Sequence, residues 1–415
     1  MLNTPGALRL QIGIFGKRNA GKSSLFNALS GQESSIVSDV PGTTADPVFK
    51  AMEIPVLGPV LLMDTAGLDD DDALLGGKRV DRSRKVLERA DLILLVTEGF
   101  WGEFEEELLR EARKRKTPVI VVFNKADLRT PERPVTESLQ NRQIDFISLS
   151  AKEKTCLDLL LKRILKNTPE DFRNQNLLLD GVVRKGDLLL MVTPIDSAAP
   201  RGRLILPQVQ AIRDALDHEA YSLVVKENAL EEILSKLKSL PDLVVTDSQV
   251  FGVVSQQIPP EVALTSFSIL MARMKGDLGI CAAGAAAIGT LKKNATVLIA
   301  EACTHPAGHE DIGTVKIPAM LRKRGLDDLQ IRFVHGQDFP EDLSGIDLVI
   351  HCGGCMLNNK AMLSRILQCR EQNVPFTNYG VCIAWCTGIL ERALSPFPEA
   401  LLCYKKALEK RSASL

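Results

Sequence analysis

The chain has 415 residues, which is too long for one compact core, so we expect two or three domains. Its formal net charge is −1, and this lack of a basic excess disfavours tight binding to RNA or DNA. The first residues lack the pattern of a signal peptide, and no apolar run reaches the roughly 18 residues of a membrane span. We therefore expect a cytoplasmic protein with neither a membrane nor a nucleic-acid partner.

A phosphate-binding loop follows the first expected strand. The strand LRLQIGIFG runs into GKRNAGKSS, in which Gly16 to Ser23 match the pattern G-x-x-x-x-G-K-S. Glycines in such a loop let backbone N–H groups surround phosphates, and the following helix points its positive end at them. Lys22 would reach the β- and γ-phosphates, and Ser23 would bind Mg²⁺.

Two further segments supply candidate magnesium and γ-phosphate contacts. The apolar strand in LLMDTAG ends at Asp64, where a carboxylate can hold the Mg²⁺ shell. Gly67 leaves a backbone N–H free for the γ-phosphate, and Thr44 in PGTTADP is a candidate ligand of Mg²⁺ and the γ-phosphate. Lys22, Thr44, Asp64 and Gly67 are therefore the candidate catalytic residues.

Two later motifs indicate selection of guanine. The strand in PVIVVFNKADL ends in Asn124-Lys125-Ala126-Asp127, and Asp127 can accept two hydrogen bonds from guanine that adenine cannot offer. A further strand precedes Ser150-Ala151-Lys152 and an amphipathic helix. The candidate nucleotide-binding residues are Gly16, Asn19, Gly21, Lys22, Ser23, Ser24, Thr44, Asp64, Asn124, Lys125, Asp127, Ser150, Ala151 and Lys152.

These motifs, in this order, resemble the TrmE/Era-type class of small GTPases. The resemblance implies a doubly wound sheet over about residues 8–170, with GTP and Mg²⁺ at the carboxyl ends of its strands. Leu68 stands where many GTPases place a water-orienting glutamine, so intrinsic hydrolysis is expected to be slow or to need help. Asn19 lies where relatives use K⁺ beside the phosphates, although an asparagine that merely fits the turn explains it equally well.

The middle of the chain predicts a small parallel sheet without chemistry of its own. Strands are expected in residues 187–196, 220–227 and 242–249, with helical patterns between them. His218 falls on one of these helices beside a charged neighbour and is expected as a solvated surface histidine. A domain with a core and no catalytic grouping suits self-association, so we expect a homodimer formed here.

The last 150 or so residues predict a third α/β unit whose strands end in cysteine and histidine. One strand ends near Glu301 and leads to Cys303 and His305, and another ends at HCGGC, which contains His351, Cys352 and Cys355. If the two strands are neighbours in one sheet, these side chains can converge.

Three thiolates could hold a 4Fe–4S cluster, with Cys303, Cys352 and Cys355 as ligands and the fourth iron left to a weaker ligand. Glu301, His305 and His351 are the candidates for that fourth position. A Cys₃His zinc site is the alternative, because the same donors suit tetrahedral Zn²⁺, and buried core cysteines are a second alternative. The other cysteines, Cys156, Cys281, Cys369, Cys382, Cys386 and Cys403, fall in helical patterns and are expected in the core.

The C-x-H and H-C-x-x-C groups behind a TrmE/Era-type GTPase domain resemble the FeFe-hydrogenase maturation GTPase family, HydF, over essentially the whole chain. The resemblance implies an α/β protein with a GTPase domain at 1–172, a dimerisation domain at 173–262 and an iron–sulfur cluster-binding domain at 263–415. It also implies a scaffold that delivers a diiron precursor, with two radical-SAM maturases and the apo-hydrogenase as partners.

Two other hypotheses remain open from the sequence. The first is a ribosome- or tRNA-linked GTPase with a zinc-stapled tail, which the GTPase motifs fit but the neutral charge disfavours. The second is a redox enzyme that uses Cys352 and Cys355 as a dithiol, although it leaves Cys303 and the histidines unexplained.

Overall fold

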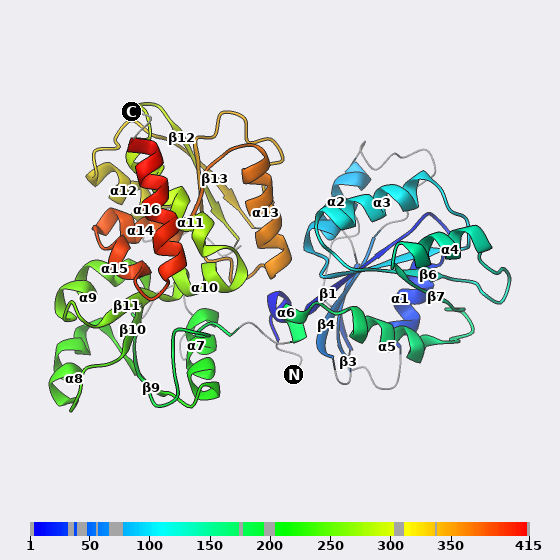
Figure 1. Cartoon of the computed structure of the whole chain (residues 1–415), viewed down its shortest axis with the longest axis horizontal. Coiled ribbons are helices and arrows are strands. Elements are labelled where there is room, and N and C mark those ends of the chain that lie inside the picture. Colours follow the sequence, from blue (N-terminus) through cyan, green and yellow to red (C-terminus); the bar gives the residue numbers. More distant parts are fainter. Residues whose placement is uncertain are drawn as a thin grey trace. The chain divides into compact units, whose positions relative to one another are not determined.

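The computed structural model describes residues 4–31, 37–39, 48–54, 57–65, 78–173, 177–194, 204–302, 311–336 and 338–412. The chain divides into two compact units, residues 1–175 and 176–415. Figure 1 shows that each unit is built of strands covered by helices, and most of the strand pairs are parallel. The α/β class expected from the sequence is therefore confirmed. No helix in the described part of the chain is long and apolar enough to cross a membrane.

The first unit contains a seven-stranded sheet with the order β2-β3-β4-β1-β5-β6-β7. The central strands β1 and β5 are buried along their whole length, as expected for parallel strands covered on both faces. The edge pairs β2–β3 and β3–β4 are antiparallel, and the sequence analysis does not predict β2 or β3. The strands are β1 (Leu10–Phe15), β2 (Val37–Asp39), β3 (Val48–Ile54), β4 (Gly58–Asp64), β5 (Leu92–Thr97), β6 (Val119–Phe123) and β7 (Asp145–Ser148).

Two separate hydrophobic cores lie on the two faces of this sheet. Alternate residues of β5 point to opposite faces, so Leu94 joins one core and Leu95 joins the other. Helices α1 (Lys22–Ser30) and α5 (Leu157–Asn167) cover one face, and α2 (Lys78–Arg89), α3 (Glu103–Lys114) and α4 (Arg133–Asn141) cover the other (Figure 1). The predicted doubly wound sheet is therefore confirmed for this unit.

The second unit contains two parallel four-stranded sheets. Their orders are β11-β10-β8-β9 and β13-β12-β14-β15. The first has β8 (Leu188–Val192), β9 (Tyr221–Val225), β10 (Leu243–Thr246) and β11 (Ala263–Ser266); the second has β12 (Thr296–Glu301), β13 (Gln330–His335), β14 (Leu348–His351) and β15 (Phe376–Asn378). The sequence analysis does not predict strand β11, because its four residues are too few to show a period.

One continuous core joins the two sheets of the second unit, from Leu190 on β8 to Ile350 on β14. Helix α10 follows β11 directly, and Ser266 caps it by accepting a hydrogen bond from the Ile269 N–H. The helices of this unit are α7 (Leu206–Asp217), α8 (Leu230–Lys236), α9 (Phe251–Gln257), α10 (Phe267–Lys275), α11 (Leu278–Ala285), α12 (Ile317–Lys323), α13 (Asn359–Glu371), α14 (Tyr379–Thr387), α15 (Leu390–Leu394) and α16 (Pro398–Ser412), and a short α6 (Glu170–Arg173) ends the first unit.

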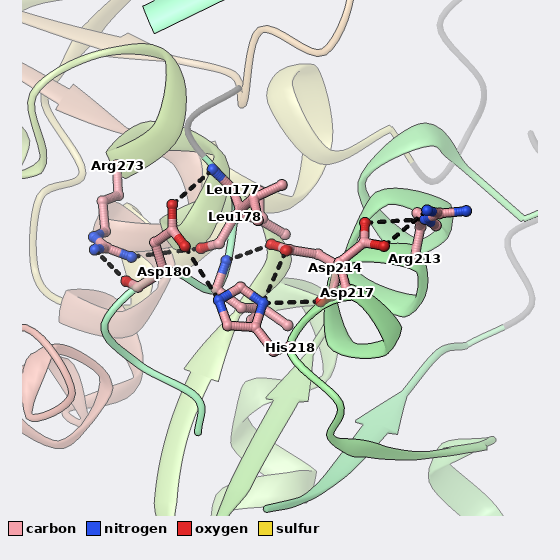
Figure 2. A network of polar contacts seen from close by, with 9 residues as sticks. Leu177, Leu178, Asp180, Arg213, Asp214, Asp217, His218 and Arg273 are labelled. Carbon is pink, nitrogen blue, oxygen red and sulfur yellow. Dashed lines mark hydrogen bonds and ion pairs between the residues drawn. The ribbon is translucent and has the colours of Figure 1, made fainter. Parts of the chain in front are cut away.

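A network around His218 holds the segment with which the second unit begins (Figure 2). The ring contacts the Asp214 carbonyl oxygen through Nδ1 at 2.9 Å and Asp180 Oδ1 through Nε2 at 3.1 Å. The Asp214 carboxylate accepts the Leu179 N–H at 2.6 Å, and Arg273 donates to the Asp180 carbonyl at 2.5 Å. The prediction of a solvated surface histidine is therefore wrong, because the turn that carries Asp180 folds back onto α7.

The charges around this ring set the pH at which His218 titrates. Burial alone would lower the pKa of His218, but the hydrogen bond to the Asp214 carbonyl and the charges of Asp214 and Asp180 raise it overall. Burial raises the pKa of Asp214, although the Leu179 N–H and the charge of His218 oppose that shift. The folded state therefore favours the protonated imidazole.

We expect the stability of the second unit to depend on pH through His218. Because its pKa is raised, the stabilisation is complete below the unfolded-state value of about 6.5 and is lost as the pH rises through the folded-state pKa. His218→Asn should remove this dependence of the free energy of unfolding on pH. It should also lower the free energy of unfolding at pH 6 by up to about 1 kcal/mol, a small value because Asp180 is exposed. Denaturant unfolding from pH 5.5 to 8.5 measures the free energy of unfolding and its change with pH. A variant with the same pH dependence as the wild type would contradict the role of His218.

Candidate functional site

The phosphate-binding loop lies between β1 and α1, as the motif predicts. Gly16 fits because a Cβ there would lie 2.2 Å from the Val96 carbonyl oxygen of β5. Gly21 has φ +88° and begins α1, and a Cβ there would meet the Asn124 side chain at 2.1 Å. Asn19 also has a left-handed φ, +64°, which asparagine tolerates better than most residues. The loop therefore needs its glycines for close approach of the backbone.

Lys22, Ser23 and Asp64 meet at the ends of β1 and β4. Lys22 is buried and donates to the Lys17 carbonyl at 2.7 Å, and Ser23 Oγ donates to Asp64 Oδ2 at 3.0 Å. Burial lowers the pKa of Lys22 and raises the pKa of Asp64, and the opposite charges of the pair oppose both shifts.

This arrangement fits a magnesium ion. Asp64 Oδ1 is buried and has no hydrogen-bond partner among the described residues, and Oδ2 holds the Ser23 hydroxyl. A hydroxyl and a carboxylate are oxygen donors of the kind that Mg²⁺ prefers when it also binds phosphate. Bound there, the ion would neutralise charge on the β- and γ-phosphates.

Asn124 ties three of the motifs together. Its side-chain amide donates to the Ala20 carbonyl at 3.0 Å and its Oδ1 accepts the Ala151 N–H at 3.0 Å. Asn124 is 3 % exposed, so these contacts are structural bonds between the phosphate loop and the Ser150-Ala151-Lys152 loop. Lys125, with φ +58°, pairs with Glu98 at the end of β5.

Asp127 lies at the surface, where a base could reach it. A hydrogen bond from the Ser150 side chain is the main cause that lowers the pKa of Asp127, so the carboxylate is ionised and can accept hydrogen bonds. The Ser150 N–H donates in turn to Thr155 Oγ1 at 2.9 Å, a support that the sequence analysis does not predict.

Lys152 and Ser24 are exposed. Thr44, Gly67 and Leu68 lie outside the described residues.

The second site lies where β12 and β14 end side by side. The two strands pair in parallel, with Ala300 opposite His351, so the condition that the two strands are neighbours in one sheet is met. Cys352 Sγ accepts the Ala302 N–H at 3.2 Å and the Gly354 N–H at 3.3 Å. This thiol therefore lies against the residue that precedes Cys303 in the chain.

Residues 352–357 form a turn between β14 and the Asn358 cap of α13, and we call it the thiol turn. Gly354 has φ +62°, which favours glycine, whereas Gly353 does not need a left-handed backbone and has room for a side chain. Cys352 is 7 % exposed and Cys355 is half-buried. The backbone of the turn therefore requires a glycine at position 354 and not at position 353.

His351 is fully buried and has a partner on each ring nitrogen. Arg365 Nη1 donates to Nε2 at 2.8 Å, so the proton must lie on Nδ1, which donates to the Cys352 carbonyl at 2.8 Å. Phe376 packs on the ring at 5.7 Å between centroids, and Arg365 lies over Phe339 at 5.1 Å. His351 therefore connects the Cys352 carbonyl of the thiol turn to Arg365 on α13.

Glu301, the other described candidate for the fourth position, contacts a histidine. It lies opposite His335 in the β12–β13 register, and its Oε2 is 3.3 Å from His335 Nδ1. Glu301 is 9 % exposed, so its carboxylate lies at the sheet edge rather than in open solvent.

A buried lysine, which the sequence analysis does not predict as functional, holds the thiol turn. Lys275 at the end of α10 is 1 % exposed and donates to the carbonyls of Gly354 at 3.1 Å, Cys355 at 3.3 Å and Leu357. Burial lowers the pKa of Lys275 to about 8, and negative charge on Cys355 and Cys352 opposes the shift. The signal in the sequence is a cation four residues after buried Met271, on the apolar side of a helix.

Cys352, Cys355, His351 and Glu301 lie at or just after the ends of the neighbouring strands β12 and β14, whereas Cys303 and His305 lie outside the described residues. Within the ranges that the structure describes, no group of three or more metal-ligating side chains occurs. The donor chemistry fits a cluster, because thiolates that accept backbone N–H bonds next to a fixed cation are suited to an anionic iron–sulfur core.

Comparison with known protein families also separates a GTPase domain from the rest of the chain. Residues 178–276 match the hydrogen maturase F dimerization domain and residues 280–396 match the hydrogen maturase F tetramerization domain, which together cover just over half of the chain. The chain belongs to the hydrogen maturase F family. Residues 11–125 match the model described as 50S ribosome-binding GTPase, so the first unit is a GTPase domain.

Curated GTPases are similar to part of the chain. GTPase Der of Wolinella succinogenes is 40 % identical over 167 residues, which cover 38 % of this chain and 35 % of that protein. The tRNA modification GTPase MnmE of Syntrophotalea carbinolica is 39 % identical over 155 residues, 37 % of this chain and 33 % of its own length. The chain thus spans about a third of the length of these relatives. The G domain of the T. maritima FeoB iron transporter is 24 % identical, covering 39 % of this chain and 99 % of that chain, with a TM-score of 0.31.

Proposed function

We propose that this maturase hydrolyses GTP to GDP and phosphate in its first unit and carries a 4Fe–4S cluster in its second. The observation that carries the cluster proposal is the hydrogen bond from the Ala302 N–H to Cys352 Sγ. Cys303, which lies outside the described residues, follows Ala302 in the chain, and we propose its thiol as the third ligand. Cys303, Cys352 and Cys355 are the proposed ligands.

The fourth iron would keep an exchangeable ligand. Glu301, His305 and His351 remain the candidates, but His351 would first have to give up one of its two hydrogen bonds. A site with three firm ligands and one open position can accept a further donor, which suits a scaffold that passes cargo on. In the first unit, Ser23, Asp64 and Thr44 are proposed to hold Mg²⁺, and Asn19 is proposed to face a K⁺ ion.

The cluster proposal is tested by changing the thiols one at a time. Cys303→Ser, Cys352→Ser or Cys355→Ser should lower iron and sulfide from about four of each per chain to a small fraction, because three thiolates are needed to hold the core. GTP hydrolysis should stay within about twofold in all three, since the nucleotide site lies in the other compact unit.

Cys386→Ser is the matched control, because Cys386 is also a half-buried thiol of the second unit. It should keep its iron and sulfide. Zinc without sulfide in the purified wild-type protein would overturn the cluster proposal and favour instead a ribosome- or tRNA-linked GTPase with a structural zinc site.

We further propose that the protein is a scaffold that delivers a diiron precursor to apo FeFe-hydrogenase after receiving it from two radical-SAM maturases. The membership of the family supports this role. The domain limits that go with it are 1–172 for GTP, 173–262 for dimerisation and 263–415 for the cluster. Bound GTP would bias a two-state segment near Thr44 and residues 68–79 and so alter affinity for a partner.

This switch predicts that nucleotide controls the release of a partner. Apo-hydrogenase or a maturase bound to the immobilised protein should dissociate several-fold faster with one nucleotide state than with the other, since each state favours a different affinity. Dissociation rates with GTP, GDP and a non-hydrolysable analogue measure the effect. Equal rates in all three states would exclude the switch.

A homodimer through the first sheet of the second unit is the last part of the proposal. Strand β9 ends the sheet among the described strands, and its residues Tyr221 and Val224 are 67 % and 40 % exposed. An exposed apolar edge strand can pair with the same strand of a second copy. The match to a dimerization domain over residues 178–276 supports this assignment.

A charge on this edge should weaken the dimer. Val224→Lys should raise the dimer dissociation constant about tenfold or more, because two-fold symmetry would bring one added lysine from each copy to the same interface. Val315→Lys, at a valine of similar exposure in the other half of the unit, is the control. Molar mass by light scattering over a dilution series measures both, and a wild-type monomer at all concentrations would contradict the dimer.

A further inference from the structure

We infer that Lys275 is a positioning residue of the cluster site: it fixes the thiol turn through three backbone carbonyls and supplies the cation that balances the thiolates. The inference rests on the proposed cluster function. It concerns a residue that lies eighty positions before Cys355 in the chain and reaches the site only through the fold.

The three acceptors indicate a charged group. Lys275 Nζ contacts the carbonyl oxygens of Gly354, Cys355 and Leu357. An ammonium has three N–H donors and a neutral amine has two, so only the cation can satisfy all three carbonyls at once. A neutral side chain of the same size would leave buried acceptors without partners, at a cost for each.

The position of the cation is set by α10 and by the sequence of the turn. Met271 and Lys275 lie four residues apart on one side of α10, and Met271 Cβ is one of the two nearest atoms to a Cβ built on Gly353, at 3.7 Å. That side of the helix therefore packs on the thiol turn. The same carbonyls belong to residues that flank Cys355, so holding them also fixes where the thiol points.

The charge has a second consequence for the site. Thiolates and a cluster held by them are anionic, and in a buried setting an uncompensated negative charge is costly. A fixed cation a few ångströms away favours the thiolate over the thiol and favours addition of an electron to the cluster. Removing the charge should therefore weaken metal binding and lower the reduction potential of the cluster.

Arg273 on the same helix is a matched control. It is also a cation that donates to backbone carbonyls, those of Leu178 and Asp180, and it lies against Phe397. Two residues apart on a helix point about 200° apart, so Arg273 faces away from the thiol turn. A general loss of stability or of positive charge from α10 should affect Lys275→Met and Arg273→Met alike, and a specific role should not.

The experiment compares Cd²⁺ binding by the apo-protein with cluster properties after anaerobic reconstitution. Lys275→Met should bind Cd²⁺ about 10–100-fold more weakly than wild type, as expected when a supporting partner of a ligand is lost. It should also hold less iron and sulfide and show a lower reduction potential. Arg273→Met should match wild type in all three measurements.

A second variant covers the possibility that Lys275→Met does not fold. Lys275→Gln keeps N–H donors but has no charge, so it should fold more stably than Lys275→Met and still show the lower potential. Unfolding midpoints are measured for each variant. Failure of both to fold would overturn the inference, because it would assign Lys275 to the core of the unit rather than to the turn.

The outcomes separate the inference from the proposed function. Folded Lys275 variants with wild-type Cd²⁺ affinity and potential, or an equal loss in Arg273→Met, would overturn the role of Lys275 and leave the cluster standing. Wild-type protein that takes up no iron and sulfide would overturn the cluster. In that case a Cd²⁺ affinity that still depends on Lys275 and not on Arg273 keeps the lysine as the support of a thiolate site.

Discussion

The parallel pairing of β12 with β14 is the constraint on which the second site depends. Strands in parallel end at the same edge of the sheet, so the residues after them meet even though about fifty positions separate them in the chain. The Ala302 N–H reaches Cys352 Sγ across this edge, and the Cys352 N–H donates back to the Ala300 carbonyl at 2.9 Å. A shift of register by one residue would turn His351 out of the core and Cys352 away from Ala302.

The strand pairing alone is not sufficient for a site. It brings polar groups together at the end of an apolar core, where each buried polar group needs a hydrogen-bond partner. His351, Arg365 and Lys275 are each less than 6 % exposed, and each is balanced by a carbonyl, a ring nitrogen or a thiol. Removal of any one leaves another buried group without a partner, at about 1–3 kcal/mol for a neutral group and more for a charge. The thiol turn is thus held by a network whose members stabilise one another.

Much of this could be predicted from the sequence, and the misses share a cause. Strands such as β1, β5 and β12 are continuous apolar runs, and the GTPase motifs mark strand ends, so their positions follow from local patterns. Lys275 and Arg365 could not be assigned in this way because their partners lie on other elements. His218 was predicted as solvated because nothing in its own helix reveals that Asp180 folds back onto it. Local periodicity reports elements and their buried faces, whereas a pairing between distant polar side chains is a property of the tertiary fold.

Each unit has a buried lysine, at the phosphate-binding loop in the first and at the proposed cluster site in the second, and the two lysines differ in what they hold. Lys22 donates to the carbonyl of Lys17 in its own loop, a single neutral partner that a phosphate can replace. Lys275 holds three carbonyls that no ligand replaces without unfolding the thiol turn. The first lysine is therefore free to follow the nucleotide through binding and release, as a switch requires. The second keeps its charge in one place whatever is bound, which suits the proposed role of retaining a cluster while the other unit cycles.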